Sequence, residues 1–172
     1  FLFIAQLIKL QALREARDEL RLVSDSLDPG IVDLAMLIGT LRSRLEKRLG
    51  HHGLRFEWAV RAVPTPDHLQ AHHFLHVLRI AQEAITNVIK HAGAKIVRVA
   101  THVDGPYVVL EISDDGCGLG AGQGGRGLKN MSRRAQEISA ELDVVDTGAG
   151  TRVRLKIPRT LEAQTAAPAA TL

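Results

Sequence analysis

The residues best suited to chemistry gather in a glycine-rich stretch, residues 114–128, with the sequence DDGCGLGAGQGGRGL. It holds seven of the fifteen glycines in the chain. Glycine is costly in regular structure, so this density indicates backbone that needs positive φ or that approaches a ligand closely. A carboxylate such as Asp114 can accept a hydrogen bond from an exocyclic amine, and bare N–H groups can bind phosphate oxygens. The stretch therefore indicates a nucleotide pocket, and the alternative is a flexible surface loop.

A second polar group lies on a helix that apolar spacing predicts over residues 67–92. At about 100° per residue, four of its polar side chains fall within about 100° of one another, opposite the apolar residues. They are Glu83, Asn87, Lys90 and His91. Together they offer a base, a neutral oxygen ligand and two groups that can carry positive charge. An ordinary surface helix is amphipathic too, so the alternative here is a solvated face.

Alternating and apolar runs predict the strands that hold these groups. Residues 106–113 are mostly β-branched and apolar, which predicts a buried strand that ends at Asp114. Residues 95–103 precede them across an Asp104-Gly105 turn, which is the pattern of a hairpin. We expect the remaining strands over residues 54–60, 142–147 and 151–157, and a helix over residues 129–140.

Two helices are predicted before the first strand. Apolar residues recur at spacings of three and four over residues 3–27, which predicts a long amphipathic helix. Its apolar stripe could pack in a bundle or a dimer, or fold back on its own domain. The sequence Asp28-Pro29-Gly30 ends this helix, and leucine spacing predicts a second one from about Asp33 to residue 49.

Composition restricts the function classes. With 172 residues, 45% of them hydrophobic, the chain can hold one domain with a sizeable core and an appendage. The net charge is +3, but the basic residues are dispersed and aromatic residues make up only 3%, so nucleic-acid binding is not expected. Cys117 is the single cysteine and cannot form an internal disulfide. Gln6 and Lys9 interrupt the apolar start, so no transmembrane helix is expected.

Four separated stretches agree in order and context with the sequence boxes of one family. QEAITNVIKHAGA (residues 82–94) resembles an N box, DDGCG (residues 114–118) a D-x-G-x-G box and GRGLKNM (residues 125–131) a G-x-G-L box. GTRVRLKIP (residues 150–158) resembles the closing strand of the same domain. The family is the GHKL ATPases, which contain DNA gyrase, the ninety-kilodalton heat-shock chaperone, MutL-type repair proteins and histidine kinases. One glycine motif alone would be weak evidence, but three in the family's order are specific.

Within this superfamily the chain looks most like bacterial sensor histidine kinases of the nitrate/nitrite-sensor type. The resemblance implies an α+β fold of the Bergerat type, a two-layer α/β sandwich with a mixed sheet covered on one face by helices. The catalytic ATP-binding domain would cover residues 54–158. A long N-terminal helix, residues 1–28, would be the end of the dimerisation helix, residues 29–53 a linker helix and residues 159–172 a disordered tail.

The family's site residues carry over onto matching positions. Asn87 would ligate Mg²⁺ through its amide oxygen, and Glu83 would polarise a water or the attacking group. Asp114 would accept the adenine amino hydrogen, and Thr151 would join it around an adenine-bound water. The remaining positions bring backbone or charge close to the nucleotide. At the base these are Gly116 and Gly118, and at the phosphates Lys90, His91, Gly125, Gly127 and Leu128.

The resemblance implies a cytoplasmic Mg-ATP-dependent protein histidine kinase that relays phosphate to a response regulator and forms a homodimer through its N-terminal helix. Membrane anchoring of the parent protein is left open. The family's acceptor histidine precedes an acidic residue, and none of the eight histidines here does, so we expect the acceptor outside this chain. The alternatives are an anti-sigma-type protein serine kinase and a non-catalytic, ATP-gated interaction module. A metal site at His72 and His76 is a further alternative, although we expect these side chains to face solvent.

Overall fold

A five-stranded mixed sheet forms one layer of the protein. The computed structural model describes residues 34–119 and 125–161. The strands are β1 (Arg55–Ala59), β2 (Ile96–Asp104), β3 (Tyr107–Asp114), β4 (Glu141–Asp146) and β5 (Thr151–Pro158). Their order in the sheet is β1-β2-β3-β5-β4, with β1 and β2 parallel and the other neighbours antiparallel. The predicted helix over residues 3–27 lies outside the described residues.

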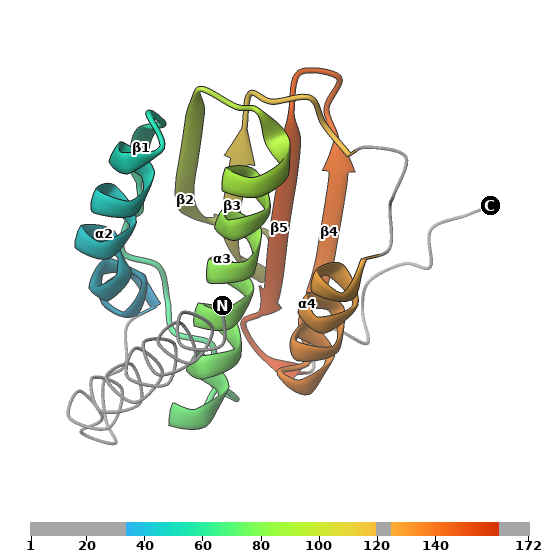
Figure 1. Ribbon diagram of the computed structural model, residues 1–172. Helices are drawn as coiled ribbons and strands as arrows, with labels where there is room; N and C mark the ends of the chain where they lie inside the picture. Colours follow the sequence, from blue (N-terminus) through green and yellow to red (C-terminus); the bar gives the residue numbers. More distant parts are fainter. Residues whose placement is uncertain (1–33, 120–124, 162–172) are drawn as a thin grey trace, which may run out of the picture. The chain divides into compact units, whose positions relative to one another are not determined.

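Three helices form the second layer and cover one face of the sheet (Figure 1). They are α2 (Leu34–His51), α3 (Ala71–Asn87), which continues into the π-helical turn η1 (Val88–Ala92), and α4 (Arg126–Glu137). A parallel pair of strands requires a crossover, and α3 with η1 provides the one between β1 and β2. The described part of the chain is thus the predicted two-layer α+β sandwich.

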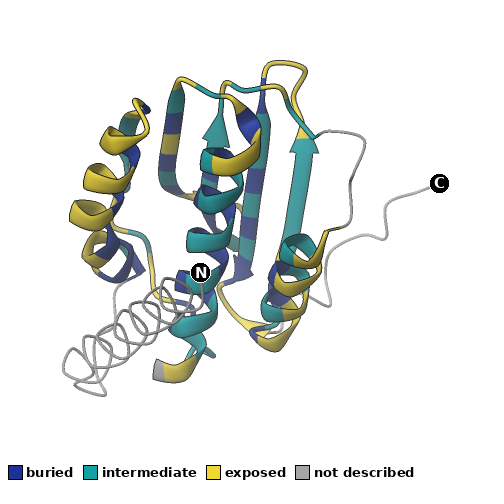
Figure 2. Ribbon diagram, viewed as in Figure 1, coloured by how far each residue is buried: buried dark blue, intermediate teal, exposed yellow. Residues whose placement is uncertain are grey.

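The core lies between the two layers, and the hydrophobic periodicity of each element explains it. The leucines that predicted α2 are buried together with Ile38 along one of its faces, while most of the other residues of that helix are exposed (Figure 2). All five apolar residues that predicted α3 are likewise buried. In β5, Val153, Leu155 and Ile157 are buried and alternate with half-buried basic residues. Across the sheet, Nε of Arg154 lies 3.6 Å from a carboxylate oxygen of Glu111.

Most element boundaries differ from the prediction by one or two residues, and the starts of two helices differ by more. The helix predicted from residue 67 begins at Ala71, where the Nδ1 atom of His73 accepts a hydrogen bond from the backbone N–H of Gln70 (3.0 Å). The helix predicted from residue 129 begins at Arg126, so the G-x-G-L box forms its first turn. Of the segment predicted as the tail, the structure describes residues 159–161, and the Arg159 N–H donates a hydrogen bond to the carbonyl of Pro106 (2.8 Å). Residues 162–172 lie outside the described ranges.

No helix in residues 34–119 and 125–161 combines the length and the apolar character that a membrane span requires.

Candidate nucleotide site

The N box occupies the last turns of α3 and the whole of η1. Glu83 and Asn87 are half-buried near the end of α3, and Lys90 and His91 are exposed on η1. The prediction of a regular α-helix as far as residue 92 is wrong for its last five residues, which form a π-turn. A π-turn is wider than an α-turn, so the uniform 100° spacing does not hold for Lys90 and His91. Such turns occur often at functional sites.

The end of η1 packs directly against the D-x-G-x-G box. The backbone N–H of Cys117 donates a hydrogen bond to the carbonyl of Ala92 at 2.8 Å. A Cβ atom at Gly116 would collide with that same carbonyl group. Gly116 does not have positive φ, so the close approach is the reason for a glycine there. The N box and the D-x-G-x-G box therefore form one continuous surface.

Asp114 ends β3 and has one carboxylate oxygen engaged. Its Oδ1 accepts a hydrogen bond from the N–H of Gly116 at 2.8 Å, an arrangement that fixes the side chain over the turn. No hydrogen bond within the described ranges engages its Oδ2, and this half-buried carboxylate can accept one from an exocyclic amine. Gly150, with φ of 129°, lies against the carbonyl of Asp114, so Thr151 at the start of β5 is next to the box.

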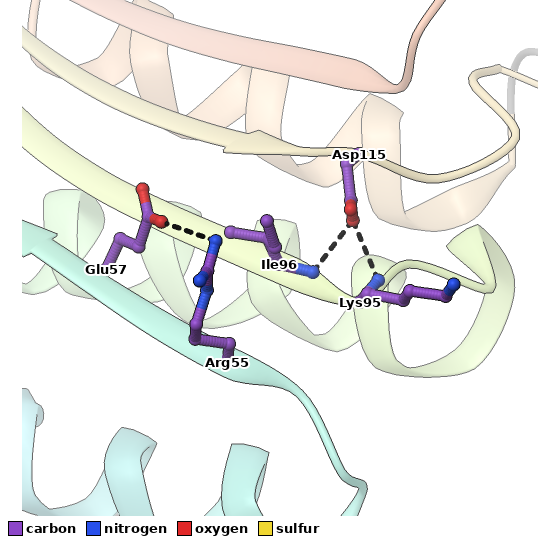
Figure 3. A network of polar contacts seen from close by, with 5 residues as sticks. All are labelled: Arg55, Glu57, Lys95, Ile96 and Asp115. Carbon is purple, nitrogen blue, oxygen red and sulfur yellow. Dashed lines mark hydrogen bonds and ion pairs between the residues drawn. The ribbon is translucent and has the colours of Figure 1, made fainter.

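Asp115 anchors the other side of the box, as Figure 3 shows. Its Oδ1 accepts hydrogen bonds from the backbone N–H groups of Lys95 and Ile96, both at 2.7 Å. These bonds, Ile96 first, lower the pKa of the Asp115 carboxyl below its ordinary value. Sequence reasoning missed this residue, although aspartate beside a glycine turn commonly binds nearby backbone N–H groups.

The G-x-G-L box meets the N box across α3 and α4. Gly125 is the N-cap residue of α4, and a Cβ atom at Gly127 would collide with the carboxylate of Glu83. The first intrahelical bond of α4 runs from the N–H of Lys129 to the carbonyl of Gly125 (3.3 Å). The N–H groups of the first turn, which includes Gly127 and Leu128, therefore have no intrahelical acceptor and can bind an anion.

The other sites considered from sequence receive less support. Within the described residues no cluster of three or more histidine, cysteine, aspartate or glutamate side chains could hold a metal ion. The expectation that His76 faces solvent is wrong, because its side chain is only 24% exposed and its Nδ1 lies 2.9 Å from Oε2 of Glu137. That contact lies outside hydrogen-bonding geometry, and burial lowers the pKa of His76 despite the carboxylate. His72 is exposed.

The donor set and the shape of the site fit a magnesium-bound adenine nucleotide. The glycines at positions 116 and 127 allow Ala92 of η1 and the Glu83 carboxylate to approach the backbone of the boxes, and the anion-binding turn of α4 lies beside Glu83. The amide oxygen of Asn87 is a hard ligand of the kind Mg²⁺ accepts, one helical turn from the Glu83 carboxylate. Mg²⁺ commonly takes only one or two protein ligands and completes its shell with phosphate oxygens and water, so a larger cluster is not required.

Comparison with known proteins gives one matching family model. Residues 73–161, just over half of the chain, match the model described as "Histidine kinase-, DNA gyrase B-, and HSP90-like ATPase". The matched range contains the N box, the D-x-G-x-G box and the G-x-G-L box.

Individual relatives and solved structures agree with this match. The chain is 30% identical over 156 residues to the sensor histidine kinase MctS of Rhizobium johnstonii, covering 87% of this chain and 33% of that protein. It is 38% identical over 87 residues to the sensor protein VraS of Staphylococcus aureus, covering 48% and 25%. The chain thus spans about a third or less of these relatives.

The blue-light activated histidine kinase of Erythrobacter litoralis has a similar fold, with a TM-score of 0.72 at 21% identity, covering 91% of this chain and 51% of that one. The histidine kinase AdeS of Acinetobacter baumannii has a TM-score of 0.65 at 17% identity, covering 91% and 83%.

Proposed function

Because this chain belongs to the family of histidine kinase-, DNA gyrase B- and HSP90-like ATPases, we propose that it carries the ATP-binding catalytic domain of a two-component sensor histidine kinase. One observation carries the proposal: the sequence boxes meet one another. Gly116 lies against Ala92, Gly127 against Glu83 and Gly150 against Asp114. Direct contacts therefore link all parts of the family motif, which supports a ligand shared among them.

The adenine end of the site is formed by β3, the box that follows it and the start of β5. Asp114 accepts the adenine amino hydrogen through Oδ2, since its Oδ1 is engaged by Gly116. Thr151 lies close enough to the box to share a bridging water with Asp114. Gly116 and Gly118 keep the backbone free of side chains where the base approaches. The carboxylate accepts from the 6-amino group of adenine, whereas guanine has a carbonyl oxygen at that position, so the site favours adenine over guanine.

The phosphate end is formed by η1 and the first turn of α4. The N–H groups near Gly125, Gly127 and Leu128 bind phosphate oxygens, and the positive end of the helix dipole favours their charge. The exposed cationic groups of Lys90 and His91 add to this field. Mg²⁺, held by Asn87, would neutralise charge on the transferring group, and Glu83 would orient the attacking group. The contact of Glu83 with Gly127 places this carboxylate beside the phosphate-binding turn.

The reaction of the whole protein follows from the same family. The γ-phosphoryl group passes to a histidine outside these 172 residues and then to a response regulator. The segment of residues 1–28 pairs two copies through its apolar stripe, with residues 29–53 as the linker. The nitrate/nitrite-sensor type remains our proposed subtype, and it rests on the likeness of the N-terminal segments and boxes alone.

Titration calorimetry with Mg-ATP on the 172-residue chain tests the proposal. Asp114→Ala should weaken ATP binding by roughly tenfold to a hundredfold, since a hydrogen bond to a charged group contributes about 1.5–3 kcal/mol. Asn87→Ala should remove the dependence of affinity on Mg²⁺. Asp104→Ala, at the exposed far end of the same hairpin, is the matched control. ATP affinity that is the same in Asp114→Ala and in the control would contradict the adenine assignment.

A second measurement separates binding from transfer. Incubation with γ-labelled ATP should leave this chain free of acid-labile, base-stable phosphate, because none of its histidines has the acceptor's acidic neighbour. Transfer also requires the nucleophile to be held in line with the phosphorus, which histidines of the ATP-binding domain have no reason to satisfy. Label on the isolated chain would show that the acceptor has been misplaced.

A further inference from the structure

Asp146, which no sequence box contains, makes the contacts that hold the end of the D-x-G-x-G box. It is the last residue of β4, and its side chain is exposed. Its Oδ2 accepts a hydrogen bond from the N–H of Leu119 at 3.1 Å, and its Oδ1 accepts one from the N–H of Gly148 at 2.8 Å. One carboxylate thus joins the residue that follows the box to the turn between β4 and β5.

The carboxylate also lies directly against Gly118. A Cβ atom at Gly118 would occupy the position of the Asp146 carboxylate, and Gly118 has φ of 75°, a conformation that favours glycine. Two features therefore favour glycine as the last residue of the box: its positive φ and the close approach of the Asp146 carboxylate.

The turn that Asp146 connects to the box is itself well ordered by hydrogen bonds. The N–H and the Oγ1 of Thr147 both bond to the carbonyl of Gly150, at 2.9 and 3.0 Å. Gly150 in turn packs against the carbonyl of Asp114, at the start of the box. The β4–β5 turn therefore contacts the box at both of its ends, through Gly150 at the start and through Asp146 at the end.

We propose that Asp146 is a positioning residue of the adenine site. It positions Gly118 and Leu119 relative to the turn that precedes Thr151. The inference rests on the proposed nucleotide-binding function and adds a residue to it. Because Asp146 acts at the adenine end, its loss should weaken recognition of the base while leaving the phosphate-binding turn of α4 unchanged. A residue that only stabilised the β4–β5 turn would not produce this difference.

The test compares three probes on the full chain: ADP, GDP and inorganic tripolyphosphate, each by titration calorimetry. Asp146→Ala should weaken ADP binding by roughly three- to tenfold, a size expected for exposed hydrogen bonds to a carboxylate. Tripolyphosphate affinity should stay within about twofold, and the preference for ADP over GDP should fall. The ADP affinity of Asp146→Asn should lie between those of Asp146→Ala and the unsubstituted chain, since the amide oxygen replaces only one of the two acceptors. Asp143→Asn is the matched control, because Asp143 lies on the same strand opposite Arg154 and away from the box.

Amide hydrogen exchange provides a readout that does not depend on a ligand. The Leu119 N–H should exchange faster in Asp146→Ala than in the control. Unchanged exchange, or equal losses of ADP and tripolyphosphate affinity, would overturn the inference while the proposed function stands. Failure of the unsubstituted chain to bind ADP would overturn both.

Discussion

Replacing Gly116 with alanine tests the contact on which the whole site depends. A Cβ atom at this position would collide with the carbonyl oxygen, the carbonyl carbon and the Cβ atom of Ala92. Two of these three are backbone atoms of η1, so they cannot turn aside as the end of a flexible side chain could. The box must therefore move away from η1, and the hydrogen bond from Cys117 to Ala92 (2.8 Å) is lost with that movement.

The expected cost follows from three contributions. Overpacking a close contact costs about 1–3 kcal/mol, and the lost hydrogen bond costs about 1 kcal/mol. The alanine recovers roughly 0.4–1 kcal/mol by restricting the unfolded chain. The net destabilisation is thus about 1–3.6 kcal/mol. Since 1 kcal/mol shifts the unfolding midpoint by roughly 2–4 °C at this chain size, the midpoint should fall by about 2–14 °C.

Two other glycines separate this contact from the ordinary effects of alanine. Gly50 has open space around its Cβ position and no positive φ, so Gly50→Ala near the end of α2 should be neutral or stabilising by up to about 1 kcal/mol. Gly93 also has open space but φ of 58°, so Gly93→Ala should cost about 1–2 kcal/mol through backbone strain alone. Thermal unfolding, monitored by circular dichroism, ranks the three variants by their unfolding midpoints. An unfolding midpoint of Gly116→Ala at or above that of Gly50→Ala would refute the contact.

Three further predictions concern the same site and its surroundings. Gly127→Ala should displace the flexible Glu83 carboxylate and slow phosphoryl transfer to a supplied acceptor, with stability changed by less than about 1 kcal/mol. Gly50→Ala, which meets open space on α2, is the control, and equal slowing in both would contradict the Glu83 contact. The lowered pKa of Asp115 means that its stabilising contribution is present above pH 3.8 and is lost as pH falls through its folded-state pKa, so Asp115→Asn should flatten the acid side of a stability–pH curve. Burial lowers the pKa of His76, so its neutral form stabilises the fold above pH 6.5 and this stabilisation declines below pH 6.5. If the free energy of unfolding of a His76→Gln variant had the same slope between pH 5 and 7 as that of the unsubstituted chain, this cause would be excluded.

Hydrophobic periodicity predicted most of the fold, because each element has one buried face and a repeat that matches its geometry. The leucines of α2, the apolar residues of α3 and the alternation in β5 are examples in which the predicted face is the buried one. The start of α4 could not be predicted in this way. Glycines at 125 and 127 have low helix propensity, and the turn that contains them lies against Glu83 of α3, a neighbour that the local sequence does not indicate.

The π-turn and the anchoring carboxylates were missed for a related reason. η1 ends where Ala92 accepts the Cys117 N–H, a bond between segments 25 residues apart in sequence. Asp115 and Asp146 likewise bind backbone groups of other segments, on β2 and after the box. The local sequence shows that these side chains are present, but it does not show which distant backbone groups they bind in the folded chain.

Three glycines of the described residues bear on the two alternatives that the sequence left for the glycine-rich stretch, a nucleotide pocket and a flexible surface loop. A flexible surface loop would need glycine for freedom alone, so its Cβ positions would be open. At Gly116, Gly118 and Gly127 a Cβ atom would instead collide with another segment: η1, the Asp146 carboxylate and Glu83. Only Gly118 of these has positive φ, so close packing rather than backbone conformation accounts for glycine at the other two. Glycine at positions 116 and 127 allows the boxes to come into direct contact with one another, and glycine at position 118 allows the close approach of the Asp146 carboxylate.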